Sequence, residues 1–281
     1  MHKIMLFVDA RFPPENECLN KAISIAKAFK LPIDLLLDVR KPHLERWYWP
    51  ELLEMHALGD KTEDEANNVI LSIQKTLSTS YVKSTVTRLD KSAFSGQISA
   101  LSETLANCLL LISSELKDKA RAKFQEIVEV HAPTLVLTQQ AWRSPLNLAV
   151  AIDPLHENAI ETQVDDRLFN QAATIKKKLE INFFLLHSCY IPPMAIDYHK
   201  QIIQIHKEAV NEFAGTKRIN TIDINIIKGN PEETIPSWVT DNQIDILAMG
   251  QFRRSKIKQY LIGSTAMTLI ERMPCDLLLV S

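Results

Sequence analysis

Short apolar runs alternate along the chain with longer segments in which apolar residues recur every three or four positions. Residues 3–8 form the first apolar run, and residues 15–30 carry Leu19, Ala22, Ile23 and Ala26 on one helical face. A nearly unbroken apolar run is typical of a strand that is covered on both faces of a parallel sheet. The pattern therefore predicts an α/β fold in which strands and amphipathic helices alternate.

The same alternation continues to the end of the chain. The predicted strands are residues 3–8, 32–39, 84–89, 109–113, 134–138, 146–153, 181–188, 221–227, 244–249 and 276–280. The predicted helices are residues 15–30, 62–77, 94–105, 117–130, 164–179, 198–213, 231–240 and 265–272.

The order of elements starts again in the middle of the chain. Asp9 and Asp153 both close a first strand, and Pro133 and Pro274 both precede a last strand. We interpret this as a duplication, with domains at residues 1–141 and 145–281. Each domain is expected to be a doubly wound, five-stranded parallel sheet with helices on both faces, and such sheets bind ligands beyond the carboxyl ends of their strands.

Residues 41–59 interrupt the pattern in the first half. They include Trp47, Tyr48 and Trp49 between two prolines. Aromatic side chains of this kind cover core edges or interfaces, or stack on a ligand, and packing or an interface is the preferred interpretation. A homodimer contact through Trp47–Trp49 is one form that such an interface would take.

The composition narrows the choice of partners and compartment. The 46% apolar content can fill a sizeable core, and the net charge of −2 gives no general attraction to nucleic acid or to an anionic membrane. No apolar run reaches membrane-spanning length, and the N-terminus lacks the features of a secretory signal. The four cysteines are far apart and are expected to be buried thiols in a cytoplasmic protein, with no metal site.

Candidate chemistry gathers near the end of the chain. Gly250 stands where the strand 244–249 ends, and Gly263, Ser264 and Thr265 precede an apolar-periodic segment. Ser or Thr at a helix N-terminus, with free backbone N–H groups and the helix dipole, favours an anion such as phosphate. The basic residues around Arg253 either contact that anion or form a solvated loop, and both interpretations are open.

The second half resembles a domain of the universal stress protein family. The resemblance rests on Val-Ala-Ile-Asp at 150–153, Leu-Leu-His-Ser at 185–188, the turn at 229–235 and the closing strand at 275–281. The whole chain resembles the tandem type of this family, with the fold of the adenine nucleotide alpha hydrolases. The resemblance implies that the two halves pair internally through their last strands.

Nucleotide-binding members of the family carry Gly, two residues, Gly, nine residues, and then Gly followed by Ser or Thr. Here Gly250 and Gly263 have that separation, but Arg253 replaces the middle glycine. The resemblance implies an ATP site in the second domain, with Asp153 at the adenine or ribose and the backbone around Ser188 at the adenine. The expected binding residues are Asp153, Ser188, Met249, Gly250, Arg253, Gly263, Ser264 and Thr265.

The first half departs further from this pattern. Asp9 remains, but Ser113, Ser114 and Glu115 follow its fourth strand, and no glycine occurs between them and Pro133. A backbone cradle for phosphate is hard to build without glycine. We therefore expect the first domain not to bind nucleotide in this way.

Enzyme signatures are absent from the sequence. There is no Walker loop, no Gly-x-Gly-x-x-Gly after a first strand and no Gly-x-Ser-x-Gly. His187, on an apolar strand, is interpreted as a core histidine with one hydrogen bond rather than a catalyst. The expected function is a stress-response protein, regulatory or protective, that binds ATP. The alternative is a scaffold in which both sites are degenerate.

Overall fold

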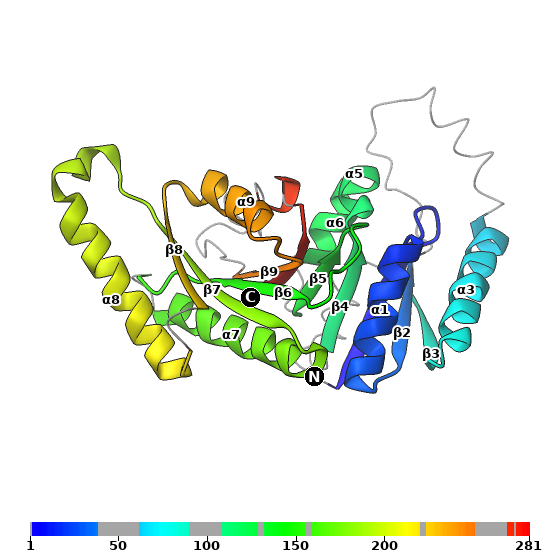
Figure 1. The fold of residues 1–281 in the computed structure, drawn as a ribbon. Helices are drawn as coiled ribbons and strands as arrows, with labels where there is room; N and C mark the ends of the chain where they lie inside the picture. The colour runs from blue at the N-terminus through cyan, green and yellow to red at the C-terminus, as the bar shows by residue number, and fades with distance from the viewer. Residues whose placement is uncertain are drawn as a thin grey trace, which may run out of the picture. The chain divides into compact units, whose positions relative to one another are not determined.

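The computed structural model describes residues 2–38, 62–89, 108–128, 132–155, 159–219, 223–250, 269–272 and 274–281. The chain divides into two compact units, Met1–Ala132 (unit 1) and Pro133–Ser281 (unit 2). Figure 1 shows the elements of both units coloured along the chain. The aromatic segment 41–59 and the predicted helix 94–105 lie outside the described residues.

The described part of unit 1 contains four strands in the order β3-β2-β1-β4, and neighbouring strands are parallel. The strands are β1 (Lys3–Asp9), β2 (Ile33–Asp38), β3 (Ser84–Leu89) and β4 (Cys108–Ser113). The helices are α1 (Asn16–Phe29), α3 (Thr62–Thr79), α5 (Glu115–Lys119) and α6 (Arg121–Val128). β2 and β4 are buried along their whole length, as their nearly unbroken apolar sequences predict.

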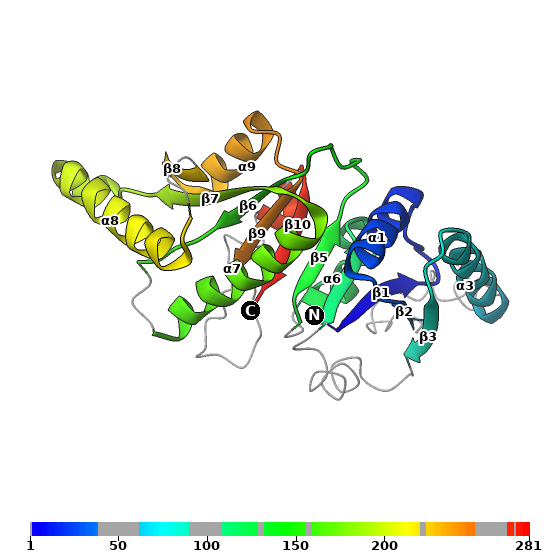
Figure 2. The same cartoon turned by 60° about the horizontal axis from the view of Figure 1, so that its bottom comes forward.

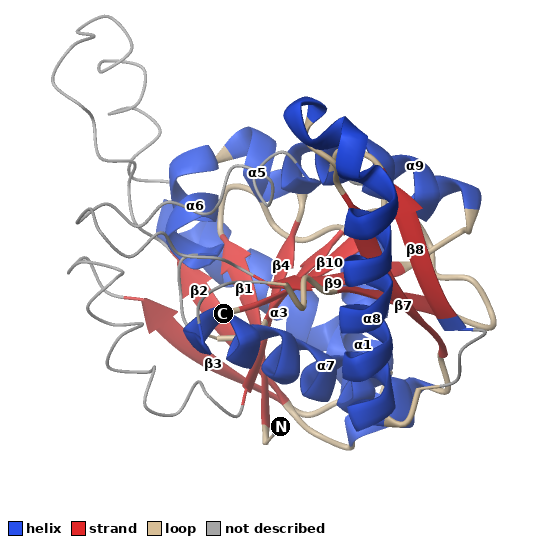
Figure 3. Ribbon diagram, turned by 90° about the vertical axis from the view of Figure 1, so that its left-hand side faces the viewer, coloured by secondary structure: helices blue, strands red, loops and turns tan. Residues whose placement is uncertain are grey.

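The described part of unit 2 contains six strands in the order β5-β10-β9-β6-β7-β8. The strands are β5 (Thr134–Leu137), β6 (Asn147–Ala151), β7 (Asn182–Cys189), β8 (Ile224–Lys228), β9 (Ile246–Gly250) and β10 (Asp276–Val280). The helices are α7 (Ala159–Leu179), the 3-10 helix η1 (Pro193–Tyr198), α8 (His199–Lys217) and α9 (Pro231–Asp241). α7 and α9 lie on opposite sides of this sheet (Figures 1 and 2), and α8 lies against β7 (Figure 3).

The predicted fold class, a mostly parallel α/β sheet with helices, is confirmed, with one exception in strand direction. β5 pairs antiparallel with β10, with Val136 opposite Leu277 and Thr134 opposite Leu279. The apolar content of a four-residue strand predicts its burial but not its direction. β5 and β10 are the last strands of the two sequence repeats, and they pair with each other.

Three helices differ from their predicted bounds. The helix predicted at 117–130 is two helices, because the backbone at Ala120 (φ −148°, ψ 58°) is not helical. α7 begins earlier than predicted, at Ala159, and α8 runs on to Lys217 after the 3-10 turn of η1. All four cysteines are buried, as expected.

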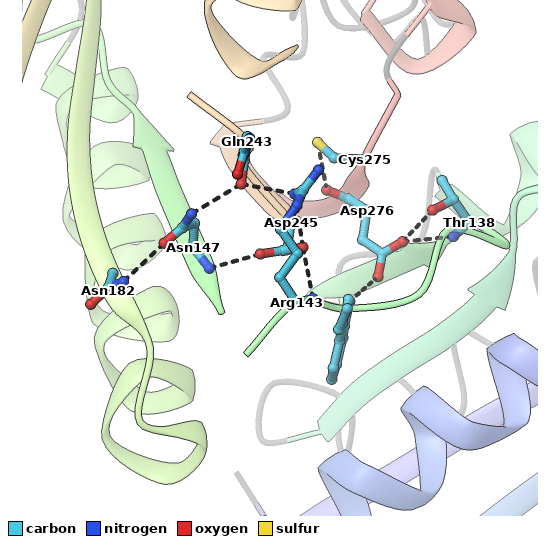
Figure 4. Close-up of polar contacts among 9 residues, drawn as sticks. Thr138, Arg143, Asn147, Asn182, Gln243, Asp245, Cys275 and Asp276 are labelled. Carbon is cyan, nitrogen blue, oxygen red and sulfur yellow. Dashed lines mark hydrogen bonds and ion pairs between the residues drawn. The ribbon is translucent and has the colours of Figure 1, made fainter. Parts of the chain in front are cut away.

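The amino ends of the parallel strands of unit 2 are held by two buried carboxylates (Figure 4). Asp276 accepts hydrogen bonds from the backbone N–H of Thr138 (2.7 Å), from the Thr138 hydroxyl (2.7 Å) and from Trp142 Nε1 (2.6 Å). Asp245 accepts from Arg143 Nη1 (3.1 Å) and from the backbone N–H of Asn147 (2.9 Å). These bonds fix the segment between β5 and β6, and they leave the opposite, carboxyl edge of the sheet for other roles.

Candidate functional site

Strand register brings several of the predicted binding residues to one edge of unit 2. β6 lies between β7 and β9 (Figure 2). Ala151 of β6 pairs with Leu186 of β7 and with Met249 of β9, so Asp153, Ser188 and Gly250 follow at the same edge. This is the carboxyl edge, where ligands of parallel α/β sheets bind.

The described residues provide only part of the predicted binding set. Met249 and Gly250 are buried at the end of β9. At the edge of the sheet, this strand end therefore offers its backbone rather than its side chains. Arg253, Gly263, Ser264 and Thr265 lie outside the described residues.

The loop after β6 is held by an acidic side chain that the sequence reasoning missed. The backbone N–H of Asp153 donates to Oδ2 of Asp165 in α7, at 3.0 Å. Asp165 is 2% exposed, and this burial raises its pKa to about 7, while the N–H of Asp153 opposes the rise and the charge of Asp153 adds to it. Asp165 therefore exchanges its proton near neutral pH.

A pair of histidines joins β6, β7 and α8 beside this loop. Nδ1 of His187 lies 3.0 Å from the carbonyl oxygen of Ile152, and Nε2 of His187 lies 2.6 Å from Nδ1 of His206. A carbonyl oxygen only accepts, so Nδ1 of His187 carries a hydrogen and, in the neutral ring, Nε2 accepts. Nδ1 of His206 must then be the donor. His187 is buried as predicted, but the expectation of one hydrogen bond was wrong, since it takes part in two.

His206 is half-buried and interacts electrostatically with His187 and Asp153. Burial lowers its pKa below the ordinary value of 6.5, the neighbouring His187 lowers it further, and the negative charge of Asp153 opposes both effects. The lowered pKa favours the neutral ring of His206, in agreement with the proton arrangement deduced from the hydrogen bonds.

Ser188 fixes the turn that leads from β8 into α9. Its hydroxyl donates to the carbonyl oxygen of Gly229 (2.9 Å) and lies 3.3 Å from Oγ1 of Thr234. Gly229 has φ of 127°, and a Cβ there would lie 2.7 Å from Cγ2 of Thr234, so only glycine fits. The Ser188 hydroxyl is already hydrogen-bonded to the turn. At the end of β7, the backbone rather than this side chain is therefore available to a ligand.

The corresponding edge of unit 1 is closed by the chain's own cation. Asp9 and Asp38 end β1 and β2 side by side, and Nζ of Lys123 from α6 lies 2.7 Å from Asp9 and 2.9 Å from Asp38. Both carboxylates are 1% exposed, and Arg11 pairs with Asp9 as well. A buried carboxylate held in this way is compensated and already occupied.

Helical periodicity could have identified Asp165 and His206. Asp165 shares a face of α7 with Leu168 and Ala172, and His206 shares a face of α8 with Val210 and Ala214. A polar residue on the buried face of a helix is a signal, because it needs a partner inside the fold.

Among the described residues, no group of three or more His, Cys, Asp or Glu side chains could hold a metal ion. None of the described helices is long and apolar enough to cross a membrane.

Comparisons with known proteins agree with this geometry. Residues 149–281 match the Universal stress protein family. Universal stress protein E of Escherichia coli K12 is 25% identical over 162 residues, which are 53% of this chain and 51% of that protein, and the Shigella flexneri protein matches equally. The chain therefore matches about half the length of these curated relatives.

Solved structures resemble the whole chain in fold. A functionally unknown protein from Pseudomonas aeruginosa PAO1 has a TM-score of 0.70 at 15% identity, covering 100% of this chain and 92% of that chain. A universal stress protein from Archaeoglobus fulgidus has a TM-score of 0.67 at 14% identity, covering 99% of this chain and 96% of that chain. The part of the chain that matches this family, residues 149–281, carries the carboxyl-edge residues Asp153, Ser188 and Gly250.

Proposed function

We propose that this chain is a tandem universal stress protein whose second domain binds an adenine nucleotide, ATP in the first place. The observation that carries the proposal is the convergence of Asp153, the Ser188 backbone and the end of β9 at one sheet edge. The glycine spacing from Gly250 to Gly263 continues from that same edge. The protein would act by binding, in a regulatory or protective role in the cytoplasm, rather than as a metabolic enzyme.

In this proposal different residues contact different parts of the nucleotide. The Asp153 carboxylate accepts from the ribose or adenine, and the backbone near Ser188 meets the base. Gly250, Gly263, Ser264 and Thr265 hold the phosphates with backbone N–H groups and hydroxyls. Arg253 supplies a charge-assisted contact in place of the small residue of the family pattern.

The first domain is proposed to be a structural partner without nucleotide. The Lys123 ammonium stands between the carboxylates of Asp9 and Asp38, the strand-end group that would otherwise face a ligand. The domains proposed from the repeat, residues 1–141 and 145–281, then form an internal pseudo-dimer. Homodimerisation of the whole chain is a further part of this proposal.

The proposal is tested by calorimetric titration of the purified chain with ATP and by mass spectrometry of nucleotide that co-purifies with it. ATP at 100 times its Kd should raise the free energy of unfolding by about 2.7 kcal/mol. Gly263→Asp should abolish this stabilisation. Gly215→Asp is the matched control, because an added Cβ at Gly215 meets no atom within 4 Å.

A scaffold with two degenerate sites is the alternative function, and a surface feature favours it. Four large hydrophobic side chains are exposed in one segment after β7, namely Tyr190 (48%), Met194 (92%), Ile196 (65%) and Tyr198 (64%). Exposed apolar clusters mark interaction sites. If neither co-purified nucleotide nor millimolar ATP binding is found, the nucleotide proposal falls and the scaffold function stands.

A further inference from the structure

Within the described part of the chain, one ring nitrogen of the histidine pair has no hydrogen-bond partner. His187 uses Nδ1 for the carbonyl of Ile152 and Nε2 for His206, and His206 uses Nδ1 for His187. Among the described residues, no hydrogen bond reaches Nε2 of His206. In the neutral pair this nitrogen carries a lone pair and no hydrogen, so it can only accept.

The ring of His206 lies within the electrostatic influence of a carboxylate. The charge of Asp153 acts on the ring of His206, and the Asp153 backbone is anchored by Asp165. A carboxylate and an imidazole lone pair together match a group that presents hydrogen-bond donors, and they repel a phosphate. The nucleotide groups with this chemistry are the ribose hydroxyls and the exocyclic amine of adenine.

We propose that His206 is a ligand-binding residue, whose Nε2 accepts a hydrogen bond from a donor group of the nucleoside beside Asp153. This inference rests on the proposed nucleotide-binding function and assigns to α8 a part in it. His187 is a positioning residue, because its bond to the Ile152 carbonyl fixes the ring arrangement that makes Nε2 of His206 an acceptor.

The arrangement makes recognition depend on pH in one direction. A proton added at Nε2 of His206 turns the acceptor into a donor and ends the match to a hydroxyl or amine. Among the described residues, Asp153 after β6 and the ring of His187 from β7 act on the charge of His206, and Asp165 of α7 holds the backbone of Asp153. Protonation of His206 should therefore weaken adenosine binding as the pH falls below about 6.5.

The first experiment uses adenosine, which lacks phosphates and so tests this subsite separately from the phosphate loop. His206→Phe removes the acceptor and should weaken adenosine binding about tenfold, the loss of one hydrogen bond. His199→Phe is the control, since His199 is exposed at the start of the same helix and contacts only the carbonyl of Ile196 in its own turn. It should leave the affinity unchanged.

Two analogues identify the donor. Wild-type protein should bind 2′-deoxyadenosine more weakly if a ribose hydroxyl is read, or inosine more weakly if the amine is read. His206→Phe should show no further loss with the analogue that lacks the donor. If the variant weakens adenosine and both analogues equally, His206 only supports the fold and the inference is overturned.

A second measurement needs no variant. Nitrogen-15 NMR of the ring nitrogens in wild-type protein should show His206 protonated at Nδ1 and not at Nε2 at pH 7.5, and the Nε2 resonance should shift with adenosine. Protonated Nε2, or an unchanged resonance at saturation, overturns the inference. Binding of adenosine without any gain from the phosphates of ATP contradicts only the phosphate loop, whereas binding of neither ligand overturns both proposals.

Discussion

Two aspartates that close equivalent strands end in opposite environments. Asp9 is 1% exposed and bonded to Lys123 and Arg11, whereas Asp153 is partly exposed and is held through its backbone by Asp165. The repeat in the sequence places the same residue type at both strand ends. In unit 1 a cation of α6, Lys123, pairs with it.

Replacing Lys123 by Met should destabilise unit 1 by about 3 kcal/mol, because it leaves Asp9 and Asp38 buried with less compensation. Urea unfolding measures this loss. Lys119→Met is the control, since Lys119 is 49% exposed and pairs with Glu115 one turn away. Such a surface pair contributes little to stability, because solvent screens it. An equal effect of both substitutions would contradict the prediction.

Asp165 predicts a pH-dependent stability whose sign follows from its raised pKa. The unfolded carboxyl loses its proton near 3.8 and the folded one near 7, so the folded state binds more protons between these values. The free energy of unfolding should therefore fall as pH rises through about 7.

The Asp165→Asn variant isolates this effect, because asparagine keeps an acceptor for the Asp153 N–H and carries no proton to lose. Relative to the variant, wild-type protein should lose stability between pH 5 and pH 8 in denaturant titrations. His206 acts in the opposite sense, since its lowered pKa removes stability as pH falls below 6.5. A wild-type-to-variant difference that is independent of pH would rule out the raised pKa.

At the scale of elements, several helices end in a left-handed residue that is not glycine. Lys30 follows α1 with φ of 57°, Glu180 follows α7 with φ of 53°, and Arg218 follows α8 with φ of 56°. The chain has 6 glycines in 281 residues, so these helices end without the residue that takes this conformation at least cost. Glycine at such a position should therefore stabilise the protein.

Lys30→Gly should raise the free energy of unfolding by about 1 kcal/mol, because it relieves the strain of a left-handed residue with a side chain. Lys27→Gly provides the contrast, as Lys27 is an exposed residue inside the last turn of α1. There glycine should cost about 1 kcal/mol. Thermal and urea unfolding of the two variants should move in opposite directions, and a shift of both the same way would refute the argument.

Sequence patterns predicted the elements that are buried and continuous, and they missed what depends on distant partners. β2 and β4 follow directly from nearly unbroken apolar runs. The break at Ala120 has no signal in the sequence that we can identify. At the site, Asp153 and Ser188 could be placed from strand ends, whereas Lys123 and His206 act across helices and required the packing to be known.

At the scale of the whole molecule, the last strand of each repeat is a neighbour of the other in unit 2. β10 lies between β5 and β9, and Asp276 at its start is fully buried. Asp276 accepts hydrogen bonds from Thr138 and Trp142, which belong to the segment after β5. One carboxylate thus joins the end of the first repeat to the end of the second.

Asp276→Asn should lower the free energy of unfolding by about 2 kcal/mol. The two oxygens of Asp276 accept from Thr138 and from Trp142, whereas the asparagine amide has one oxygen, so its NH₂ group would face one of these donors. Asn182→Ala, which removes an exposed bond to Asn147, should cost well under half as much. Nucleotide affinity should be unchanged in both, since these residues lie at the amino edge. A loss of affinity in Asp276→Asn would show that the two edges are coupled.

The position of β10 also has a consequence for synthesis on the ribosome. β5 leaves the exit tunnel long before β10 is translated. Until β10 is synthesised, the apolar residues Leu135, Val136 and Leu137 of β5 lack their neighbouring strand on one side. Unit 1, Met1–Ala132, can fold while translation continues. The sheet of unit 2 cannot be completed until β10 has been synthesised. Nascent chains of this protein should therefore depend on chaperones during the second half of their elongation.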